Sequence, residues 1–379
     1  MKIKLQKARN KKIVCDITEL ITSVRWSGSD RQASRKLEFS VINSPFDSEF
    51  DVPKIESGDI IYFYFDGKKR FTGRTLRGTS SSVVGENTYG ATDFMNILLK
   101  SDVSYNFKNI TAEKISATVI SDLGLKCGFL APTNINIASW LIDSDSGYNV
   151  ILGAYYKAYK SSGIKYMPYM DGIKVCVGKK GESSGVKLKL KTNILKSEFE
   201  ENAEDIVNKI IIYDETGKKI GTVSSADSIN LYGIYQKTLK KSEGVNANSE
   251  AESMLKEPSK TAKVDIIGNI DAVSGKSIML YDDITGLWGK FYIENDTHTF
   301  SGGIHTTSLT LAFQNFMENS EEDPKSKHPV STGEHICFYS AGGDKYHSTS
   351  SCGGMVKPVK TTVNEAVKLG KSKCLRCWQ

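Results

Sequence analysis

The chain has 379 residues, of which 39% are hydrophobic and 25% charged, an ordinary composition for folded protein and enough length for two to four domains. The first residues are lysine-rich and no apolar run follows them, so we expect no secretory leader. No stretch approaches the roughly 18 apolar residues that a membrane helix needs, so we expect no membrane span. The net charge of +6 is mild, and only 8 of the 50 basic residues are arginine, which weakens a DNA-reading function. We therefore expect a soluble protein that is made in the cytoplasm and does not contact a membrane.

Residues 1–105 read as short strands. In one run Leu37, Phe39 and Val41 alternate with polar residues, which is typical of a strand with one buried face. A continuous β-branched and aromatic run, 60–65, is followed by Asp66-Gly67, a hairpin turn. Regular turns between short strands predict a small barrel or sandwich.

The periodicity changes in residues 106–195. Thr111 is a good N-cap, and apolar residues at helical spacing follow it as far as Gly124. A second helix is expected over 147–159, and strands return around Asp171-Gly172. This segment is predicted to be an inserted α/β domain.

Strands resume in residues 196–316, where we expect a second barrel-like domain. A helix fits 248–256, ending before Pro258. Near the end, Gly302-Gly303 predicts a β-hairpin turn. The predicted fold class is thus mainly β, with two barrel-like domains and an α/β insertion between them.

Residues 317–334 hold almost no apolar side chain, and such a segment cannot bury enough surface to fold. We expect a flexible linker there. Residues 335–379 then form a separate small module.

This module has the spacing of a metal site. His347 and Cys352 are separated by four residues, and Cys374 and Cys377 form a C-x2-C pair. Four such ligands suit tetrahedral zinc, and a full set leaves no open position for catalysis. Between the pairs, a capping box at 362–365 and a stop at Gly370 predict a short helix. A module this small has little core, so we expect structural zinc to supply its folding free energy.

Two alternatives remain open for the cysteines. The C-terminal set could instead be free thiols or disulfides, although disulfides are rare in the cytoplasm. Cys337 could replace one of the four ligands. The other cysteines, Cys15, Cys127 and Cys176, are isolated beside apolar residues, and we expect them in the core.

No catalytic constellation is expected. The chain has no G-x-S-x-G, phosphate-binding loop or H-E-x-x-H motif. His298 and His305 flank the predicted Gly302-Gly303 turn, where ordinary strand or turn roles are favoured over metal binding. Asp143 and Asp145 are read as loop carboxylates rather than as an acid–base pair. The expectation is a protein that is not an enzyme.

The order of several short motifs resembles the XkdQ-type family, the baseplate hub proteins of contractile phage tails and phage-tail-like bacteriocins. No one motif is specific, and their order over roughly 310 residues carries the resemblance. The similar segments are Trp26-Ser27-Gly28, Ala33 to Phe39, Gly58-Asp59, Phe71-Thr72-Gly73, Tyr89 to Asp93, Gly286 to Ile293, His298-Thr299-Phe300 and Ile304 to Leu309. The metal module departs from the simplest hub pattern and looks like a small zinc-binding appendage.

The resemblance implies a virion structural protein, a homotrimer in which each subunit gives two barrel-like domains to a pseudo-sixfold ring. Such a ring would adapt a sixfold tail tube to a threefold central spike. The implied partners are further copies of the chain, the tail tube protein, the spike, the tape measure protein and other baseplate proteins. The implied location is the baseplate of a virion or tail-like particle assembled in the bacterial cytoplasm, and His298 and His305 would be structural.

Two other functions stay open at this point. A tail-associated cell-wall hydrolase would need a triad or an open metal site. A nucleic-acid-binding protein would use the C-terminal module, where seven Lys or Arg against two Asp or Glu give a net charge of +5. A solvated lysine-rich face is the plainer reading of that charge, so nucleic acid is not an expected partner.

Overall fold

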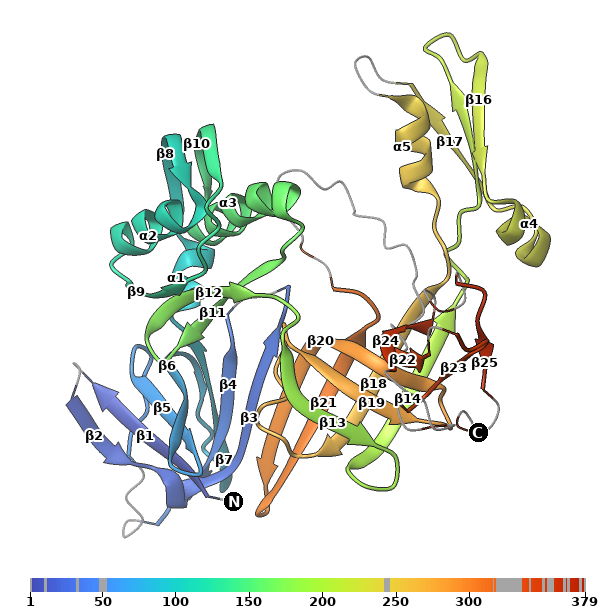
Figure 1. Cartoon of the computed structure of the whole chain (residues 1–379). Helices are drawn as coiled ribbons and strands as arrows, with labels where there is room; N and C mark the ends of the chain where they lie inside the picture. Colours follow the sequence, from blue (N-terminus) through green and yellow to red (C-terminus); the bar gives the residue numbers. More distant parts are fainter. Residues whose placement is uncertain are drawn as a thin grey trace. The chain divides into compact units, whose positions relative to one another are not determined.

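The computed structural model (Figure 1) divides by its internal contacts into two compact units, Met1–Ser197 with Lys263–Glu321 and Glu198–Ala262 with Glu322–Gln379. Among the described helices, none is both long enough and apolar enough to cross a membrane. The described residues are 2–9, 12–31, 34–47, 53–241, 246–315, 317, 336–340, 342–349, 352, 358–363, 366, 369–374 and 377.

A 13-stranded sheet dominates the fold, as the mainly β composition predicted. Its main path runs β14-β18-β21-β20-β3-β4-β7-β6-β5-β1-β2, and β13 joins through β19, which pairs with β20. The strands are β1 (Ile3–Arg9), β2 (Lys12–Asp16), β3 (Ile21–Ser29), β4 (Lys36–Asn43), β5 (Ile60–Phe65), β6 (Lys68–Thr79), β7 (Gly85–Asp93), β13 (Ser183–Lys189), β14 (Ile194–Asn202), β18 (Ser259–Ile267), β19 (Ser277–Asp282), β20 (Leu287–Ser301) and β21 (Ile304–Ala312). A 3-10 turn, Thr18–Leu20, precedes β3.

The early and late strands meet in this sheet, where β3 pairs antiparallel with β20 and Trp26 lies opposite His298. One apolar core also joins them, because Phe300 of β20 is buried with Trp26 and Phe63. The pairing path among the described strands is open rather than closed on itself. Two separate closed barrels are therefore not confirmed.

The two predicted hairpin turns are confirmed. β5 and β6 are joined at Asp66 and Gly67, whose φ angles of 45° and 77° suit a tight two-residue turn. β20 and β21 are joined at Gly302 and Gly303, with φ angles of 56° and 74°.

The segment predicted to be α/β contains helices and two small sheets. Sheet β10-β8 is antiparallel, and sheet β11-β12-β9 is mixed. The elements are α1 (Met95–Lys100), β8 (Asp102–Thr111), α2 (Ala112–Asp122), β9 (Lys126–Leu130), β10 (Asn136–Ser146), α3 (Gly147–Ser162), β11 (Tyr166–Asp171) and β12 (Lys174–Lys179). The long helix α3 is well terminated, since the Ser146 hydroxyl accepts a hydrogen bond from Asn149 N–H at 3.1 Å and Gly163 ends the helix at φ 68°.

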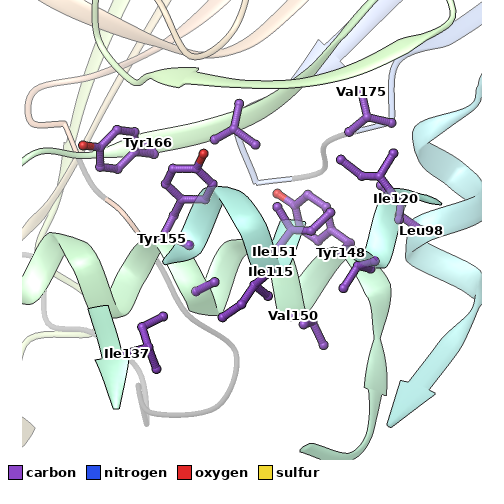
Figure 2. Packing of buried hydrophobic residues seen from close by; sticks show 14 of the residues in the cluster. Leu98, Ile115, Ile120, Ile137, Tyr148, Val150, Ile151, Tyr155, Tyr166 and Val175 are labelled. Atoms are coloured by element: carbon purple, nitrogen blue, oxygen red, sulfur yellow. The ribbon is translucent and has the colours of Figure 1, made fainter. Parts of the chain in front are cut away.

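Figure 2 shows the core of this region, in which Ile151 and Tyr155 of α3 lie among Ile115, Tyr166 and other apolar side chains. Tyr155 is 1% exposed, and its hydroxyl donates to the Ala131 carbonyl at 2.9 Å, so its polar end is satisfied. Met317, the first residue of the predicted linker, is buried in the same core. The rest of that linker, 318–334, lies outside the described residues.

The Glu198–Ala262 part of the second unit holds a small three-stranded sheet, β16-β15-β17, and two helices. Helix α5 was predicted, and α4 was not. Ala251 of α5 is buried against Ile210 and Ile212 of β15. The elements are β15 (Lys209–Tyr213), β16 (Lys219–Ser224), α4 (Ala226–Tyr232), β17 (Gln236–Lys240) and α5 (Ala247–Met254).

The C-terminal segment carries a four-stranded sheet of order β24-β22-β23-β25. Its strands are β22 (Ile336–Tyr339), β23 (Lys345–His347), β24 (Val359–Thr362) and β25 (Ser372–Lys373). Of the helix predicted between Thr362 and Gly370, the described residues Val363 and Ala366 are helical, and Gly370 has the φ of 74° expected of a helix stop. The boundaries of the five predicted segments are finer than the two compact units and stay predictions.

Candidate metal centre

Four side chains of the C-terminal segment converge on one point. The ligand atoms of His347, Cys352, Cys374 and Cys377 all lie within 4.8 Å of one another. Within the described part of the chain, this is the one such group of three or more His, Cys, Asp or Glu side chains. The structure thus brings together the four residues that the sequence spacing selected.

The small sheet explains how two distant ligands become neighbours. β23 and β25 pair in parallel, with Tyr346 opposite Lys373. The Cys374 N–H then donates to the Tyr346 carbonyl at 3.0 Å, which holds Cys374 beside the end of β23, where His347 lies. Backbone pairing, and not side-chain contact alone, therefore fixes two of the four ligand positions.

Two neighbouring groups contact the sulfur of Cys377. The Ser348 N–H donates to Cys377 Sγ at 3.4 Å, and His347 Nδ1 lies 3.6 Å from the same sulfur. The Ser348 hydroxyl also donates to the Cys377 carbonyl. These contacts hold Cys377 beside the strand that carries the histidine.

The thiols crowd one another. Hydrogen bonding to Cys377 raises the pKa of Cys352 to about 11, and burial and Cys374 act in the same direction. Three thiolates this close repel unless a cation lies among them, and a coordinating metal deprotonates such thiols. The donor set, one imidazole and three soft sulfurs, fits a zinc-like ion.

Cys337 lies outside this group of four. It is fully buried on β22 with Tyr346 and Ala366, in the small apolar core of the C-terminal sheet. Buried cysteine packs as a small hydrophobe. All seven cysteines are described, and each is a thiol rather than part of a disulfide.

Of the three isolated cysteines, Cys176 is buried as expected and Cys15 is half-buried. The expectation of a core position was wrong for Cys127, which is exposed on the short strand β9. That strand lies at the edge of its three-stranded sheet, and its side chains are exposed or half-buried along its whole length.

The two other candidate pairs have structural contacts. Asp145 accepts hydrogen bonds from the Ser146 N–H and the Asn149 side-chain amide, both at the start of α3. Carboxylates are favourable at a helix N-terminus. His298 is fully buried, and its Nε2 lies 3.2 Å from Asp296 Oδ2.

Sequence reasoning missed a buried ionic network around Asp296, which is 1% exposed. Arg35 donates from Nη1 to Asp296 Oδ1 at 3.0 Å and also pairs through Nη2 with Oδ2. The Arg35 guanidinium lies 3.9 Å from the Trp26 ring centroid, a cation–π contact. Although burial opposes ionisation, Arg35 and His298 hold the pKa of Asp296 below its usual range. The partners are 261 residues apart, and no local pattern signals such a pair.

Comparison with solved structures defines the class of fold. The chain is similar to the 43 kDa tail protein of prophage MuSo2 from Shewanella oneidensis, with a TM-score of 0.60 and 14% identity over 82% of this chain and 98% of that one. It is also similar to a tail protein from Neisseria meningitidis, with a TM-score of 0.54 and 14% identity over 82% of this chain and 96% of that one. The fold is that of prophage tail proteins.

The chain belongs to the YQBQ-like family, whose model matches residues 24–312. Two relatives from Bacillus subtilis each align with 78% of this chain. The phage-like element PBSX protein XkdQ is 24% identical, and the alignment covers 93% of XkdQ. The uncharacterized protein YqbQ is 25% identical, and the alignment covers 94% of YqbQ. The resemblance to a phage baseplate-type protein is confirmed. All four candidate metal ligands lie beyond residue 312, outside the family match.

Proposed function

We propose that this protein is the structural hub of a contractile phage tail or tail-like particle, a homotrimer that joins the sixfold tail tube to the threefold spike. The main support is the pairing of β3 with β20, which places early and late strands in one continuous sheet. A ring in which three chains present six β segments requires two such segments to be held in fixed register within each chain. The fold of prophage tail proteins supports the same role.

In this proposal, 1–105 and 196–316 are the two β segments of the ring, and 106–195 is inserted between them. The segment 317–334 acts as a tether to the metal module at 335–379. The partners are further copies of the chain, the tail tube protein, the central spike, the tape measure protein and other baseplate proteins. The particle is assembled in the host cytoplasm and carries the chain in its baseplate.

The proposed role is not enzymatic. The buried carboxylate of Asp296 is paired with Arg35. The buried carboxylate of Asp93 accepts hydrogen bonds from the Ser34 hydroxyl and from the backbone N–H groups of Arg35 and Met95. These contacts give both buried carboxylates a role in packing the fold. Clearing of peptidoglycan by the purified chain, lost on a single side-chain change, would instead support a cell-wall hydrolase.

The C-terminal module is proposed to hold one structural zinc ion through His347, Cys352, Cys374 and Cys377. The fit rests on the four converging donors and the crowded thiols. Zinc supplies charge that stabilises the three thiolates and links two chain segments, and all four protein donors are used, which leaves no open position for catalysis.

A density map of tail particles purified from producing cells tests the hub proposal. We expect three copies of the chain in a ring between the tail tube and the spike. A particle that lacks the chain, or that carries it only as separated copies on its periphery, would contradict the proposal.

A further inference from the structure

The seven arginines of the first 77 residues fall into two groups. Four of them form ion pairs with carboxylates, namely Arg9, Arg31, Arg35 and Arg70. The other three, Arg25, Arg74 and Arg77, are exposed, and no described residue offers them a hydrogen bond or ion pair. Guanidinium groups form strong hydrogen bonds with carboxylates and phosphates. Three arginines without such a partner in one region therefore indicate a partner that is another molecule.

Strand register puts these three arginines on one face of the sheet. Arg25 of β3 lies opposite Glu38 of β4, Glu38 opposite Gly90 of β7, and Gly90 opposite Arg77 of β6. Arg74 lies in the next row, opposite Thr92, and Lys36 lies on the other side of Thr92. The opposite face of the same strands is the apolar core. We call Arg25, Lys36, Arg74 and Arg77 the basic face.

Two irregularities shape this face. The register of β6 shifts between Thr75 and Arg77, and the extra residue brings Arg77 to the same side as Arg74. Gly90 has no side chain, and a Cβ built there would lie 3.7 Å from the Arg77 Cβ. The strands form a shallow, open pocket of about 330 Å³ at this point. Arg25, Glu38, Arg77 and Gly90 are among the residues that line it.

Spacing restricts what the basic face can bind. Arg25 and Arg77 lie three strand steps apart, about 14 Å at the usual interstrand distance. One carboxylate cannot contact both, whereas a run of carboxylates can. Glu38 lies between them and would repel a uniformly anionic nucleic-acid backbone. These features favour an acidic protein segment.

The chain itself contains such a segment. Residues 198–205 carry five carboxylates, and all five side chains are exposed. Glu200, Glu204 and Asp205 have no hydrogen-bond or ion-pair partner for their carboxylates among the described residues. We call residues 198–205 the acidic stretch.

We propose that the basic face of one copy binds the acidic stretch of the next copy, head to tail. The proposal rests on the homotrimer proposed above and names the surfaces that would form it. A contact between two different surfaces of the same chain closes into a ring when the rotation between copies suits it. Complementary charge sets the partner and the order of subunits around that ring.

Charge reversal and its repair test the proposal on the full chain. Arg25→Glu, Arg74→Glu and Arg77→Glu together should weaken trimer association at least about 100-fold, because like charges then face each other. Glu200→Lys, Glu204→Lys and Asp205→Lys should do the same. The chain that carries all six changes should regain association to within about 10-fold of wild type.

A control variant with the same change in net charge reverses three positive charges elsewhere on the chain. Lys108→Glu, Lys126→Glu and Lys174→Glu change three exposed strand lysines and should leave the trimer intact. Native mass measurement gives the oligomeric state of each chain, and far-UV circular dichroism shows that each reversed chain is folded.

Each outcome decides the question. A wild-type trimer that survives either reversal, or a six-change chain that stays dissociated, would overturn this inference and leave the trimer standing. Binding of duplex DNA by wild type that is lost on reversal of the basic face, with the trimer unchanged, would assign the face to nucleic acid instead. A monomeric wild type would contradict the proposed trimer itself.

Discussion

The Nδ1 atom of His298 lies 3.2 Å from the Nε2 atom of His305, across the β20–β21 hairpin. Thr307 lies within reach of both rings, with its hydroxyl 3.1 Å from His298 Nδ1. The His305 ring also stacks on Phe300, with a centroid distance of 4.2 Å. The two imidazoles thus link the buried ionic network around Asp296 to the aromatic core, and both are packed too tightly to take up a proton freely.

This packing predicts a pH dependence of stability. Burial, together with a smaller effect of His298, lowers the pKa of His305 to about 4, although Asp66 opposes the shift. Between about pH 6.5 and pH 4 the unfolded chain therefore binds more protons than the folded one, and stability must fall as pH falls through that window. His305 is only half-buried, so solvent screens part of this effect, and we expect it to contribute about 2 kcal/mol of the loss.

Denaturant titrations of wild type and His305→Gln across that pH range check the prediction. The variant should be less stable at pH 7 and should show a flatter decline on acidification. Parallel declines in the two proteins would show that His305 does not titrate in this way.

Gly268 lies directly against the His305 ring. A Cβ at Gly268 would lie 2.1 Å from His305 Cγ, which no packing tolerates without movement. Gly268→Ala should therefore destabilise the chain by about 1–3 kcal/mol, as overpacking of a core does. Gly90→Ala is the matched control, because its Cβ has only an ordinary contact at 3.7 Å and should change stability by less than about 0.5 kcal/mol. Equal midpoints of urea unfolding for the two variants would refute the steric argument.

The Arg35–Asp296 pair should be important for stability because it is buried. The side chains of this pair are 18% and 0% exposed, against 51% and 20% for the Arg31–Glu294 pair. Arg35→Met removes the guanidinium partner of a buried carboxylate, which keeps only its contacts with His298 and the Ser274 N–H, and should cost about 3–5 kcal/mol of unfolding free energy. Arg31→Met should cost less than about 1 kcal/mol. Thermal unfolding of both variants makes the comparison, and a small effect of Arg35→Met would mean that this network does not hold the early and late strands together.

Sequence patterns predicted individual helices and hairpins well, but they did not predict which distant strands pair with each other. The hairpin at Gly302-Gly303 and helices α2 and α3 follow from local turn chemistry and apolar spacing, which depend on neighbouring residues only. The pairing of β3 with β20 joins residues about 270 positions apart, and nothing in either strand specifies the other. Within 1–105 the strand β1 was not singled out, because its lysines hide the alternation of Ile3 and Leu5, although Lys7 is itself buried in an ion pair with Asp59.

The candidate metal centre was easier to predict from the sequence than the strand pairing, because the residue types and their spacing identify the possible ligands. The question of Cys337 needed the structure, which buries that side chain with Tyr346 and Ala366. The basic face could not be predicted from the sequence, because only the strand register places Arg25, Arg74 and Arg77 on one face.

Removal of one ligand tests the metal centre. Cys374→Ala should reduce zinc from one ion per chain to none and unfold the C-terminal segment, while residues 1–316 stay folded. Cys337→Ala is the control and should keep the zinc, because that thiol lies outside the group of four. Elemental analysis of the purified chains measures the zinc content of each variant.

Loss of zinc in Cys337→Ala but not in His347→Ala would support the metal and replace His347 by Cys337 in the ligand set. A metal-free wild type with a disulfide among these cysteines would refute the zinc proposal.

The most direct test of the hub proposal is the native mass of the purified wild-type chain, measured with and without a chelator. We predict a mass of three chains with three zinc ions, and loss of the zinc without loss of the trimer in the presence of chelator. A chain that stays monomeric at every concentration, with or without metal, would contradict the account.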